Sequence, residues 1–372
     1  MMRPTFAEIN LSNLIFNYQS IANRVGNNVL VMPVVKADAY GHGMIECVKA
    51  LLKTKPKPQY FAVALIEEAI ELKRKFHDVN VLVFGKIFSD DFKIISRMKI
   101  TPTIYDFPTL KNLAEFARKK KTKINFHLKV DTGMGRVGIQ LNELEDYLNF
   151  ICENRSIQLE GVYTHFATSD HRDKSFALQQ LDKFNTAIEM TKSKIKNVKY
   201  FHAANSGAIL DLPQSYFNLV RPGISLYGYY PSKETSESIP LKPVMSIKTK
   251  VAFLKWVEKD TSISYGRIYF TKERTQIGTL PIGYADGYNR LLSNKGKIIY
   301  RNKLYDVVGR VTMDQIMVNF GSDEISFDDD VIVLGSSENL KFDADDIAQL
   351  INTIPYEVCT SISKRVKRRF VY

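Results

Sequence analysis

The feature of this sequence that most restricts its fold is one pattern, repeated eight times between Val29 and Pro222. In each repeat a short apolar segment is followed by a polar turn and then by an amphipathic segment, as in a strand followed by a helix. The strands are expected at Val29–Val35, Tyr60–Val63, Val81–Phe84, Thr101–Tyr105, Ile124–Val130, Leu159–Thr164, Tyr200–Ala203 and Leu219–Arg221. Helices are expected between them, for example at Ile66–Phe76, Pro108–Lys119, Leu141–Glu153 and Phe176–Thr191. The repeats predict an α/β fold, a closed (β/α)8 TIM barrel over residues 11–232.

The pattern changes after Tyr230, where the polar, proline-bounded segment Pro231–Pro240 is typical of a linker. Beyond it, short strands are separated by Gly and Asp turns, and one helix is expected near Ala344–Leu350. These strands are expected at Val244–Trp256, Gln276–Leu280, Lys297–Tyr300, Tyr305–Val311, Gln315–Asn319 and Asp330–Leu334. We therefore predict a mostly β domain over residues 240–372. Residues 1–10 are assigned to it as well, because Thr5–Ile9 is a spare strand that could pair with it.

The net charge of +12 at pH 7 and the basic cluster Lys364–Arg369 raise nucleic-acid binding as a function class. Elsewhere the basic residues are scattered along helix-like segments, which is typical of solvated faces. The chain contains no recognised nucleic-acid module and no basic motif interleaved with aromatic residues. We therefore expect no nucleic-acid partner.

The N-terminal residues form no apolar signal region, and no run approaches the roughly 18 apolar residues that suggest a membrane span. We expect a cytoplasmic protein without membrane contact. Cys47, Cys152 and Cys359 are far apart and form no C-x-x-C pair, so neither a disulfide framework nor a zinc site is indicated. We expect them to be small buried residues, and we expect no metal.

Chemistry is first indicated in the segment Val31–Gly43, where an apolar strand ends on Lys36 and runs into a glycine-flanked turn. Burial and neighbouring cations would lower the pKa of a lysine amine from about 10.4, toward the range of a nucleophile or base. A strand-end lysine can equally extend its amine to solvent. This segment alone leaves both interpretations open.

Polar residues of catalytic types also follow other strands of the predicted barrel. A lone histidine or arginine there is usually structural, but barrel enzymes work at the C-terminal ends of their strands, and five strand ends agree. The loops after the seventh and eighth strands can bind phosphate through backbone N–H groups and small hydroxyls. A phosphate there, and an amine on the opposite side of the barrel mouth, would hold a phosphorylated aldehyde and indicate pyridoxal phosphate. The residues concerned are Lys36, Tyr40, Lys129, Arg136, His165, His202, Asn205, Ser206, Arg221, Gly223 and Ile224.

Over nearly its whole length the chain resembles the alanine racemases, which are barrel-type pyridoxal-phosphate enzymes. Together the matching motifs are specific, whereas any single glycine-rich piece would be weak evidence. The motifs are Val35–Gly43, Lys129–Arg136, Arg221–Ile224, Ser264–Gly266, Gly283–Tyr288 and Gly309–Gln315.

The resemblance implies that Lys36 forms the Schiff base and is one of two proton-transferring bases. The other base would be Tyr265, donated by the second subunit, on the opposite face of the planar substrate. Racemisation requires two such groups, because a proton removed from one face must be replaced from the other. His165 and Arg221 would hydrogen-bond with Tyr265 and tune its phenol. The implied cofactor-binding residues are Lys36, Tyr40, Arg136, His165, Asn205, Ser206, Arg221, Gly223, Ile224 and Tyr356.

The resemblance also implies that Arg221 faces the pyridine nitrogen. A guanidinium donates hydrogen bonds but cannot accept them, so the ring would stay unprotonated, which favours reprotonation over transamination. Arg136 would bind the ring oxygen of the cofactor and, with the Met313 backbone, the substrate carboxylate. Lys129 would be a carbamylated lysine that holds Arg136 in place, or else a member of a plain ion pair.

Tyr265, Tyr284, Met313 and Asp314 lie in the second predicted domain, whereas their assigned partners lie in the barrel. The resemblance therefore implies a head-to-tail homodimer with two shared sites. Tyr284 could instead be an ordinary aromatic residue beside a turn. At Thr312 the family often has cysteine, so the sequence leaves the local packing there open.

The leading functional hypothesis is interconversion of L- and D-alanine, which supplies D-alanine for peptidoglycan. A serine or broad-specificity racemase is an alternative in the same cofactor class, since the depth of the pocket is not legible from sequence. Arg221 argues against an amino-acid decarboxylase, and Tyr265 argues against a non-enzymatic cofactor carrier, which needs no second base.

Overall fold

The computed structural model describes residues 3–372, and the chain divides into two compact units. The barrel unit consists of Ile15–Ala39 and Met44–Leu241. The β unit consists of Lys242–Tyr372, Tyr40–Gly43 and the described residues up to Leu14. Helix α1 (Leu11–Val25) begins in the β unit and ends in the barrel unit.

The barrel unit contains eight parallel strands. Strands β3 to β8 pair with one another in chain order, and β2 pairs with β9. Two contacts join these groups: Val34 bridges Ala62, and the backbone N–H of Arg221 donates to the Ala204 carbonyl at 2.9 Å. The ring of strands is therefore closed, and the predicted barrel is confirmed. The strands are β2 (Leu30–Val31), β3 (Tyr60–Val63), β4 (Asn80–Val83), β5 (Thr101–Ile104), β6 (Ile124–Lys129), β7 (Ile157–Tyr163), β8 (Tyr200–His202) and β9 (Leu219–Val220).

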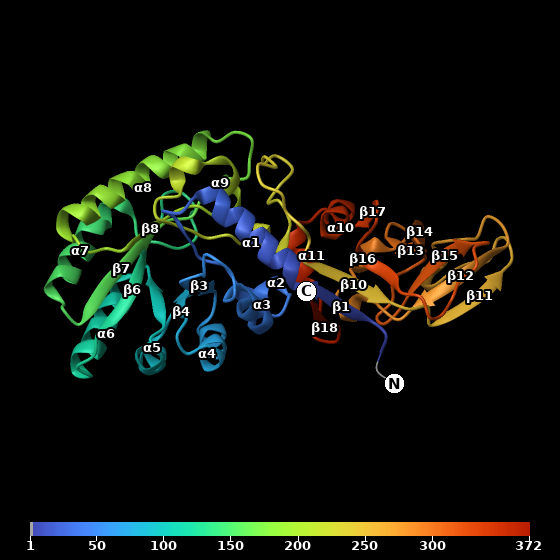
Figure 1. Ribbon diagram of the computed structural model, residues 1–372, viewed down its shortest axis with the longest axis horizontal. Coiled ribbons are helices and arrows are strands. Elements are labelled where there is room, and N and C mark those ends of the chain that lie inside the picture. Colours follow the sequence, from blue (N-terminus) through green and yellow to red (C-terminus); the bar gives the residue numbers. More distant parts are fainter. Residues whose placement is uncertain (1–2) are drawn as a thin grey trace. The chain divides into compact units, whose positions relative to one another are not determined.

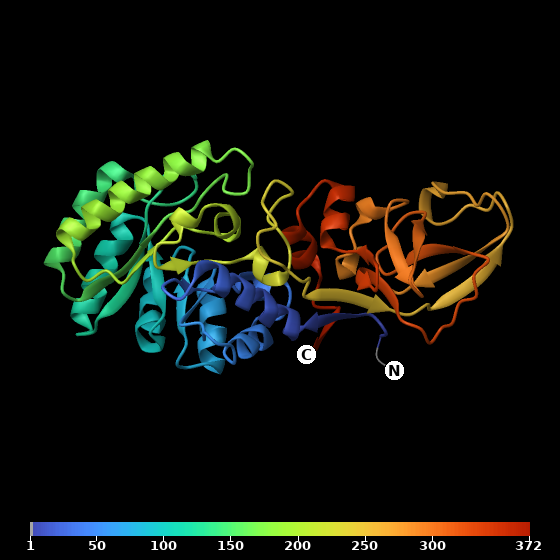
Figure 2. The same ribbon diagram turned by 45° about the horizontal axis from the view of Figure 1, so that its top comes forward.

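Helices cover the outside of these strands, and α7 and α8 lie side by side in both ribbon views (Figures 1 and 2). Helix α6 shows how local sequence sets the boundaries. The Asp106 carboxylate accepts the N–H of Thr109 at 2.9 Å, Pro108 stands in the first turn, and basic residues end the helix. The helices are α3 (Met44–Leu51), α4 (Ile66–Lys75), α5 (Phe92–Met98), α6 (Phe107–Lys119), α7 (Leu144–Glu153), α8 (Ser175–Lys194) and α9 (Ser206–Asp211).

The β unit is a twisted sheet with two short helices, α10 (Ala344–Ile351) and α11 (Pro355–Ser361). The N-terminal strand β1 pairs with β10 antiparallel and with β18 parallel, as expected for a spare strand of this sheet (Figures 1 and 2). The strands are β1 (Phe6–Asn10), β10 (Met245–Thr249), β11 (Phe253–Val257), β12 (Thr275–Leu280), β13 (Lys297–Tyr300), β14 (Lys303–Val308), β15 (Ile316–Gly321), β16 (Val331–Ser337), β17 (Leu340–Phe342) and β18 (Lys367–Val371).

Three sequence expectations for the β unit and the cysteines are wrong. The strand expected at Val244–Trp256 is two strands with different partners, because β10 pairs with β1 and β16 whereas β11 pairs with β12. Helix α11 was not expected, since its seven residues are too few for a clear helical period. Cys152 is exposed, although Cys47 and Cys359 are buried as expected.

The basic cluster near the C-terminus is part of the sheet. Arg369 lies over the ring of Phe6, with its guanidinium carbon 3.7 Å from the ring centre. Arg368 donates to the carbonyl of Gly41 at 3.0 Å and to that of Ile362 at 2.6 Å. These charges therefore have structural partners. No helix in residues 3–372 is long and apolar enough to cross a membrane.

Candidate active site

Lys36 follows the first barrel strand, β2, and begins an unusual turn. The next four residues all have positive φ, between 51° and 55°, which is a left-handed helical turn built without glycine. Such a conformation costs roughly 1–2 kcal/mol per residue, so the surroundings must hold it. The Ala39 N–H donates to the Val35 carbonyl at 2.9 Å, and the Met44 N–H donates to the Asp38 carboxylate at 2.7 Å. These two hydrogen bonds hold the left-handed turn after Lys36.

Glu68 fixes the start of this turn. One of its carboxylate oxygens accepts the Ala37 N–H at 2.5 Å, and the other accepts the N–H groups of Ala64 and Leu65 at 2.8 and 3.0 Å. One carboxylate therefore joins the N-terminus of α4 to the residue after Lys36. Glu68 was not among the residues predicted from the sequence, although an acidic residue three positions after a helix start is a known capping signal.

The Lys36 amine has the properties expected of a reactive amine. Its side chain is half-buried, and burial and then the charge of Arg136 lower its pKa, while the Glu68 carboxylate opposes them. Within residues 3–372 the amine makes no hydrogen bond or ion pair. The role of Lys36 as a reactive amine stays a prediction.

Arg221 is buried at the end of β9, with 3% of its surface exposed. Its guanidinium donates to the Thr164 carbonyl at 2.7 Å and to the Ala203 carbonyl at 2.9 Å, and lies 3.4 Å from Nδ1 of His165. Burial lowers its pKa to about 10, so the group stays charged at neutral pH. The structure thus brings together Arg221 and His165, which the family resemblance places side by side.

Two buried histidines form a chain of hydrogen bonds that begins at Arg221. A guanidinium nitrogen lies 2.8 Å from Nδ1 of His202, whose Nε2 lies 2.9 Å from Nδ1 of His127. Because Arg221 can only donate, His202 accepts with Nδ1 and donates with Nε2, and His127 accepts in turn. Burial and the charge of Arg221 lower the pKa of both rings, that of His127 to about 3, so both are neutral. His202 is a candidate residue of the sequence, whereas His127, which lies inside β6, was not predicted.

Lys129 is the last residue of strand β6, and Arg136 lies in the loop after this strand. Lys129 is buried, and its amine donates to the Val130 carbonyl at 3.0 Å. Burial, then the charges of Arg221 and Arg136, lower its pKa to about 7, while Asp131 opposes them. The Asp131 carboxylate itself accepts the N–H groups of Gly133, Met134 and Gly135 and so shapes the loop that carries Arg136. No ion pair of Lys129 occurs within residues 3–372, so the plain ion pair considered from sequence is not present.

A hydroxyl-lined cradle lies after strands β8 and β9. The Ser206 Oγ accepts the Gly223 N–H at 2.9 Å and the Ser225 N–H at 3.3 Å, and it lies 3.0 Å from the Ser225 hydroxyl. Asn205 caps α9 by accepting the Ala208 N–H at 3.1 Å. The two N–H groups and the Ser225 hydroxyl thus converge on the Ser206 oxygen and fix its position. The expected placement of this cradle opposite Lys36 is wrong, because β9 pairs directly with β2, and the two groups follow neighbouring strands.

The remaining candidate residues lie in the β unit. Tyr40 and Tyr356, both assigned to the phosphate, have ring centres 6.0 Å apart. Tyr265 stands on a tight turn between Ser264 and Gly266, with φ values of 67° and 70°, and the Ser264 hydroxyl donates to the Arg310 carbonyl at 2.7 Å. The Tyr265 side chain is 73% exposed.

Two family models match almost the whole chain. The model of the alanine racemase N-terminal domain matches residues 9–231, and that of the alanine racemase C-terminal domain matches residues 244–370. The chain belongs to the alanine racemase family. It is 42% identical to "Alanine racemase 2" of Caldanaerobacter subterraneus subsp. tengcongensis, over all of this chain and 96% of that relative.

Solved structures of alanine racemases share the fold. That of Clostridium difficile 630 has a TM-score of 0.92 and 39% identity, and covers all of this chain and 96% of the other. That of Bartonella henselae, described with covalently bound pyridoxal phosphate, has a TM-score of 0.89 and 27% identity, with 99% of both chains covered. The fold class predicted from the sequence, a barrel followed by a mostly β domain, is confirmed.

The departure from the usual alanine racemase pattern at Thr312 has a local structural role. The Thr312 hydroxyl donates to the Gln315 carbonyl at 2.8 Å, and its oxygen lies 3.1 Å from the Gln315 N–H, which donates to it. The Thr312 side chain therefore closes the turn that carries Met313 and Asp314, and the packing left open by the sequence is accounted for.

Proposed function

We propose that this chain interconverts L- and D-alanine with pyridoxal phosphate, as a head-to-tail homodimer with two shared sites, and so supplies D-alanine for peptidoglycan. The observation that carries the proposal is the combination of a half-buried Lys36 amine of lowered pKa with a charged, buried Arg221 at the next strand end. Membership of the alanine racemase family supports it. The cytoplasmic location expected from the sequence stays part of this proposal.

The donor set fits pyridoxal phosphate. The Ser206 hydroxyl can donate to a phosphate, and the Gly223 and Ser225 N–H groups fix the position of its oxygen by donating to it. Ile224, Asn205, Tyr40 and Tyr356 complete the proposed phosphate site. Arg221 suits an unprotonated pyridine nitrogen because it can only donate, and Lys36 offers the amine that an aldehyde requires. When bound, the cofactor withdraws electrons from the amino acid and weakens the bond to the α-proton.

The two proton-transferring groups are assigned to different subunits. Lys36 Nζ holds or releases a proton on one face of the substrate, helped by its lowered pKa. Tyr265 of the partner subunit does the same on the other face. His165 and Arg221 tune that phenol by hydrogen bonding and by positive charge. Arg136 and the backbone of Met313 receive the substrate carboxylate.

Lys129 is proposed to be carbamylated. An amine reacts with carbon dioxide only in its neutral form, and a pKa of about 7 makes that form abundant. Lys129 is also surrounded by the charges of Arg136 and Arg221, which a negative carbamate would offset and whose positions it would fix. A mass increase equal to one carbon dioxide on the native protein, lost on acidification, is the expected signature.

The proposed dimer needs residues of the β unit that can reach a partner. Tyr265, Met313 and Tyr284 meet this requirement, with exposed fractions of 73%, 52% and 43%. Each is a residue assigned to the partner's site. Asp314 is also solvent-facing, as such a contribution requires.

A first experiment tests the cofactor and the reaction. The purified protein is expected to be yellow, to retain the cofactor on Lys36 after borohydride treatment, and to exchange the α-hydrogen of alanine in heavy water. Protein that binds no pyridoxal phosphate would refute the proposal. Racemisation of serine at the rate of alanine would replace the substrate assignment by the broad-specificity alternative.

A second experiment tests the shared site. Lys36→Ala and Tyr265→Ala chains should each be inactive as homodimers, the latter while still yellow. When they are coexpressed, half of the dimers are mixed and one of their two sites has both groups intact, so about a quarter of wild-type activity should return. If both groups came from one chain, no mixture could recover activity.

A further inference from the structure

Two loops of the β unit carry residues that the proposed function assigns to the partner's site. The 283–287 loop follows β12 and carries Tyr284, and the 311–315 loop precedes β15 and carries Met313 and Asp314. Their backbones are joined directly. The Tyr284 N–H donates to the Thr312 carbonyl at 3.0 Å, and the next N–H donates to the Met313 carbonyl at 3.0 Å.

The two loops also approach each other too closely for a side chain at Gly283. A Cβ there would lie 2.4 Å from the carbonyl oxygens of both Thr312 and Met313. The two loops therefore form one structural piece, and whatever fixes the 283–287 loop also fixes the Met313 backbone.

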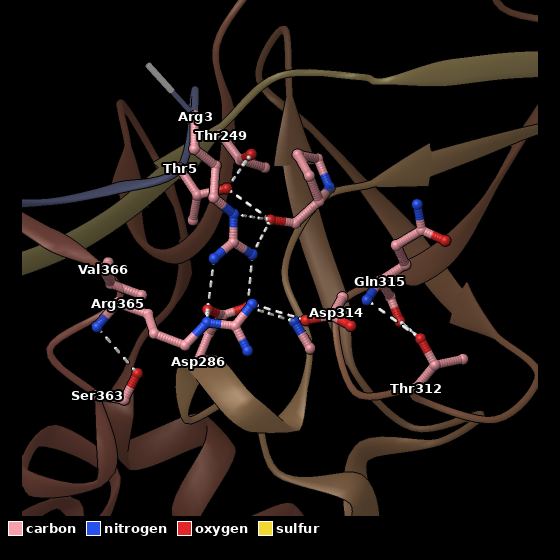
Figure 3. A network of polar contacts seen from close by, with 12 residues as sticks. Arg3, Thr5, Thr249, Asp286, Thr312, Asp314, Gln315, Ser363, Arg365 and Val366 are labelled. Carbon is pink, nitrogen blue, oxygen red and sulfur yellow. Dashed lines mark hydrogen bonds and ion pairs between the residues drawn. The ribbon is translucent and has the colours of Figure 1, made fainter.

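Asp286 fixes the 283–287 loop. It is fully buried, and its carboxylate accepts the Gly283 N–H at 3.0 Å, which closes the loop on itself. The two guanidinium nitrogens of Arg3 donate to its two oxygens, at 2.5 Å each, and Figure 3 shows this forked contact. Arg3 also donates to the Pro281 carbonyl at 3.1 Å. The N-terminal segment thus holds the loop by a rigid, two-bond contact.

Arg365 connects Asp286 to the second loop. Its guanidinium lies 3.5 Å from one Asp286 oxygen and donates to the Asp314 carboxylate at 2.6 Å (Figure 3). Two arginines from opposite ends of the chain therefore converge on one buried carboxylate. A buried ion pair adds little net stability compared with well-packed apolar residues, so its geometric effect is the more informative property.

We propose that Asp286, held by Arg3 and Arg365, is a positioning residue that sets the Met313 backbone and Tyr284 for the partner's site. This inference rests on the proposed function. It predicts that the network controls affinity for the substrate carboxylate, whereas proton transfer by Lys36 is little affected. Arg3 is the best site to test, because its side chain is partly exposed, whereas Asp286 is fully buried.

The first readout requires no activity. Hydrogen exchange at the amides of Tyr284 and Ala285 should be about tenfold faster in Arg3→Ala and in Asp286→Asn than in the wild type, because their backbone acceptors are less firmly held. Arg301→Ala is the matched control, since it removes an arginine–carboxylate pair with Asp329, at 2.7 Å, elsewhere in the β unit. Its exchange at these two amides should equal that of the wild type. If Arg3→Ala leaves both amides unchanged, the inference is refuted, even if Asp286→Asn does not fold.

The second readout is kinetic. In Arg3→Ala the KM for alanine should rise about tenfold while kcat changes less than about threefold, and the yellow absorbance should stay as in the wild type. Arg301→Ala should keep both constants. Faster exchange with an unchanged KM would overturn the link to the site, leaving a merely structural network. If instead the wild type does not racemise alanine, the proposed function is refuted. The exchange experiment would still test whether Arg3 and Asp286 fix the 283–287 loop, because it requires no activity.

Discussion

The Nδ1 atom of His202 lies 2.8 Å from a guanidinium nitrogen of Arg221, and both side chains are buried. The imidazole of His202 therefore accepts a hydrogen bond from the charged guanidinium. Its own Nε2–H donates a hydrogen bond to Nδ1 of His127. The ring of Tyr163 is stacked on His202, with centres 4.7 Å apart, so the orientation of the imidazole is fixed from the side as well. The buried guanidinium of Arg221 is thus held in place by a chain of buried side chains.

Replacing His202 should reveal how much its acceptor nitrogen contributes to the free energy of unfolding. His202→Phe keeps the stacking but leaves a buried guanidinium N–H without its partner, which costs about 2 kcal/mol of the free energy of unfolding. His202→Asn places an oxygen near the former Nδ1 and should lose about half as much. Urea denaturation of both variants gives the comparison, and equal losses would show that the Arg221 contact contributes nothing specific.

The pH dependence of stability should carry a contribution from Lys129. Its pKa is lowered to about 7 in the folded chain from 10.5, so between these values the unfolded chain binds more protons. The free energy of unfolding therefore rises with pH across this range. Between about pH 7 and pH 9 the wild type should gain about 2 kcal/mol relative to Lys129→Met, measured by denaturation in buffer free of carbon dioxide.

Bicarbonate provides the control for Lys129. A carbamylated lysine no longer titrates as an amine, so added bicarbonate should flatten the difference between the two proteins. A wild type and a Lys129→Met variant with parallel pH profiles would contradict the lowered pKa.

The substitution Glu68→Gln should lower the pKa of the Lys36 amine. The Glu68 carboxylate raises the pKa of Lys36 against the larger effects of burial and Arg136, so removing its charge should lower that pKa further. The measurement is the pH dependence of Lys36 labelling by an amine reagent in the cofactor-free protein. The midpoint should move to lower pH in Glu68→Gln and stay in place in Glu67→Gln, whose neighbouring carboxylate does not act on Lys36. A midpoint shifted upward would refute the electrostatic role of Glu68.

Gly41 should be far less replaceable than Gly26, although both have φ near 80°. A Cβ at Gly41 would lie 2.4 Å from the Cys359 carbonyl oxygen, whereas a Cβ at Gly26 would meet nothing within 4 Å. Gly26→Ala should cost about 1 kcal/mol for the backbone conformation alone, and Gly41→Ala clearly more. Thermal unfolding of the two variants checks this, and similar melting temperatures would mean that the backbone around Cys359 yields easily.

Much of the fold was predictable because it is encoded locally. Each strand–helix repeat of the barrel carries its own apolar strand and amphipathic helix, so the period of hydrophobicity predicts the elements. Strands β3 at Tyr60–Val63 and β13 at Lys297–Tyr300 lie at the residues that the pattern predicts. Local turn chemistry likewise predicts a break after Lys36. The sequence could not separate β10 from β11, because the division depends on which strands they pair with.

The amino-acid sequence by itself determined the barrel, the mostly β domain and the residue types at the strand ends, because periodicity and motif spacing are properties of short segments. Only the tertiary structure decided which groups hold the reactive ones. Glu68 reaches Ala37 across 31 residues, and Arg3 reaches Asp286 across 283. Such contacts depend on where distant parts of the chain meet in space, and side-chain charge and hydrogen bonding act over a few ångströms regardless of distance along the sequence.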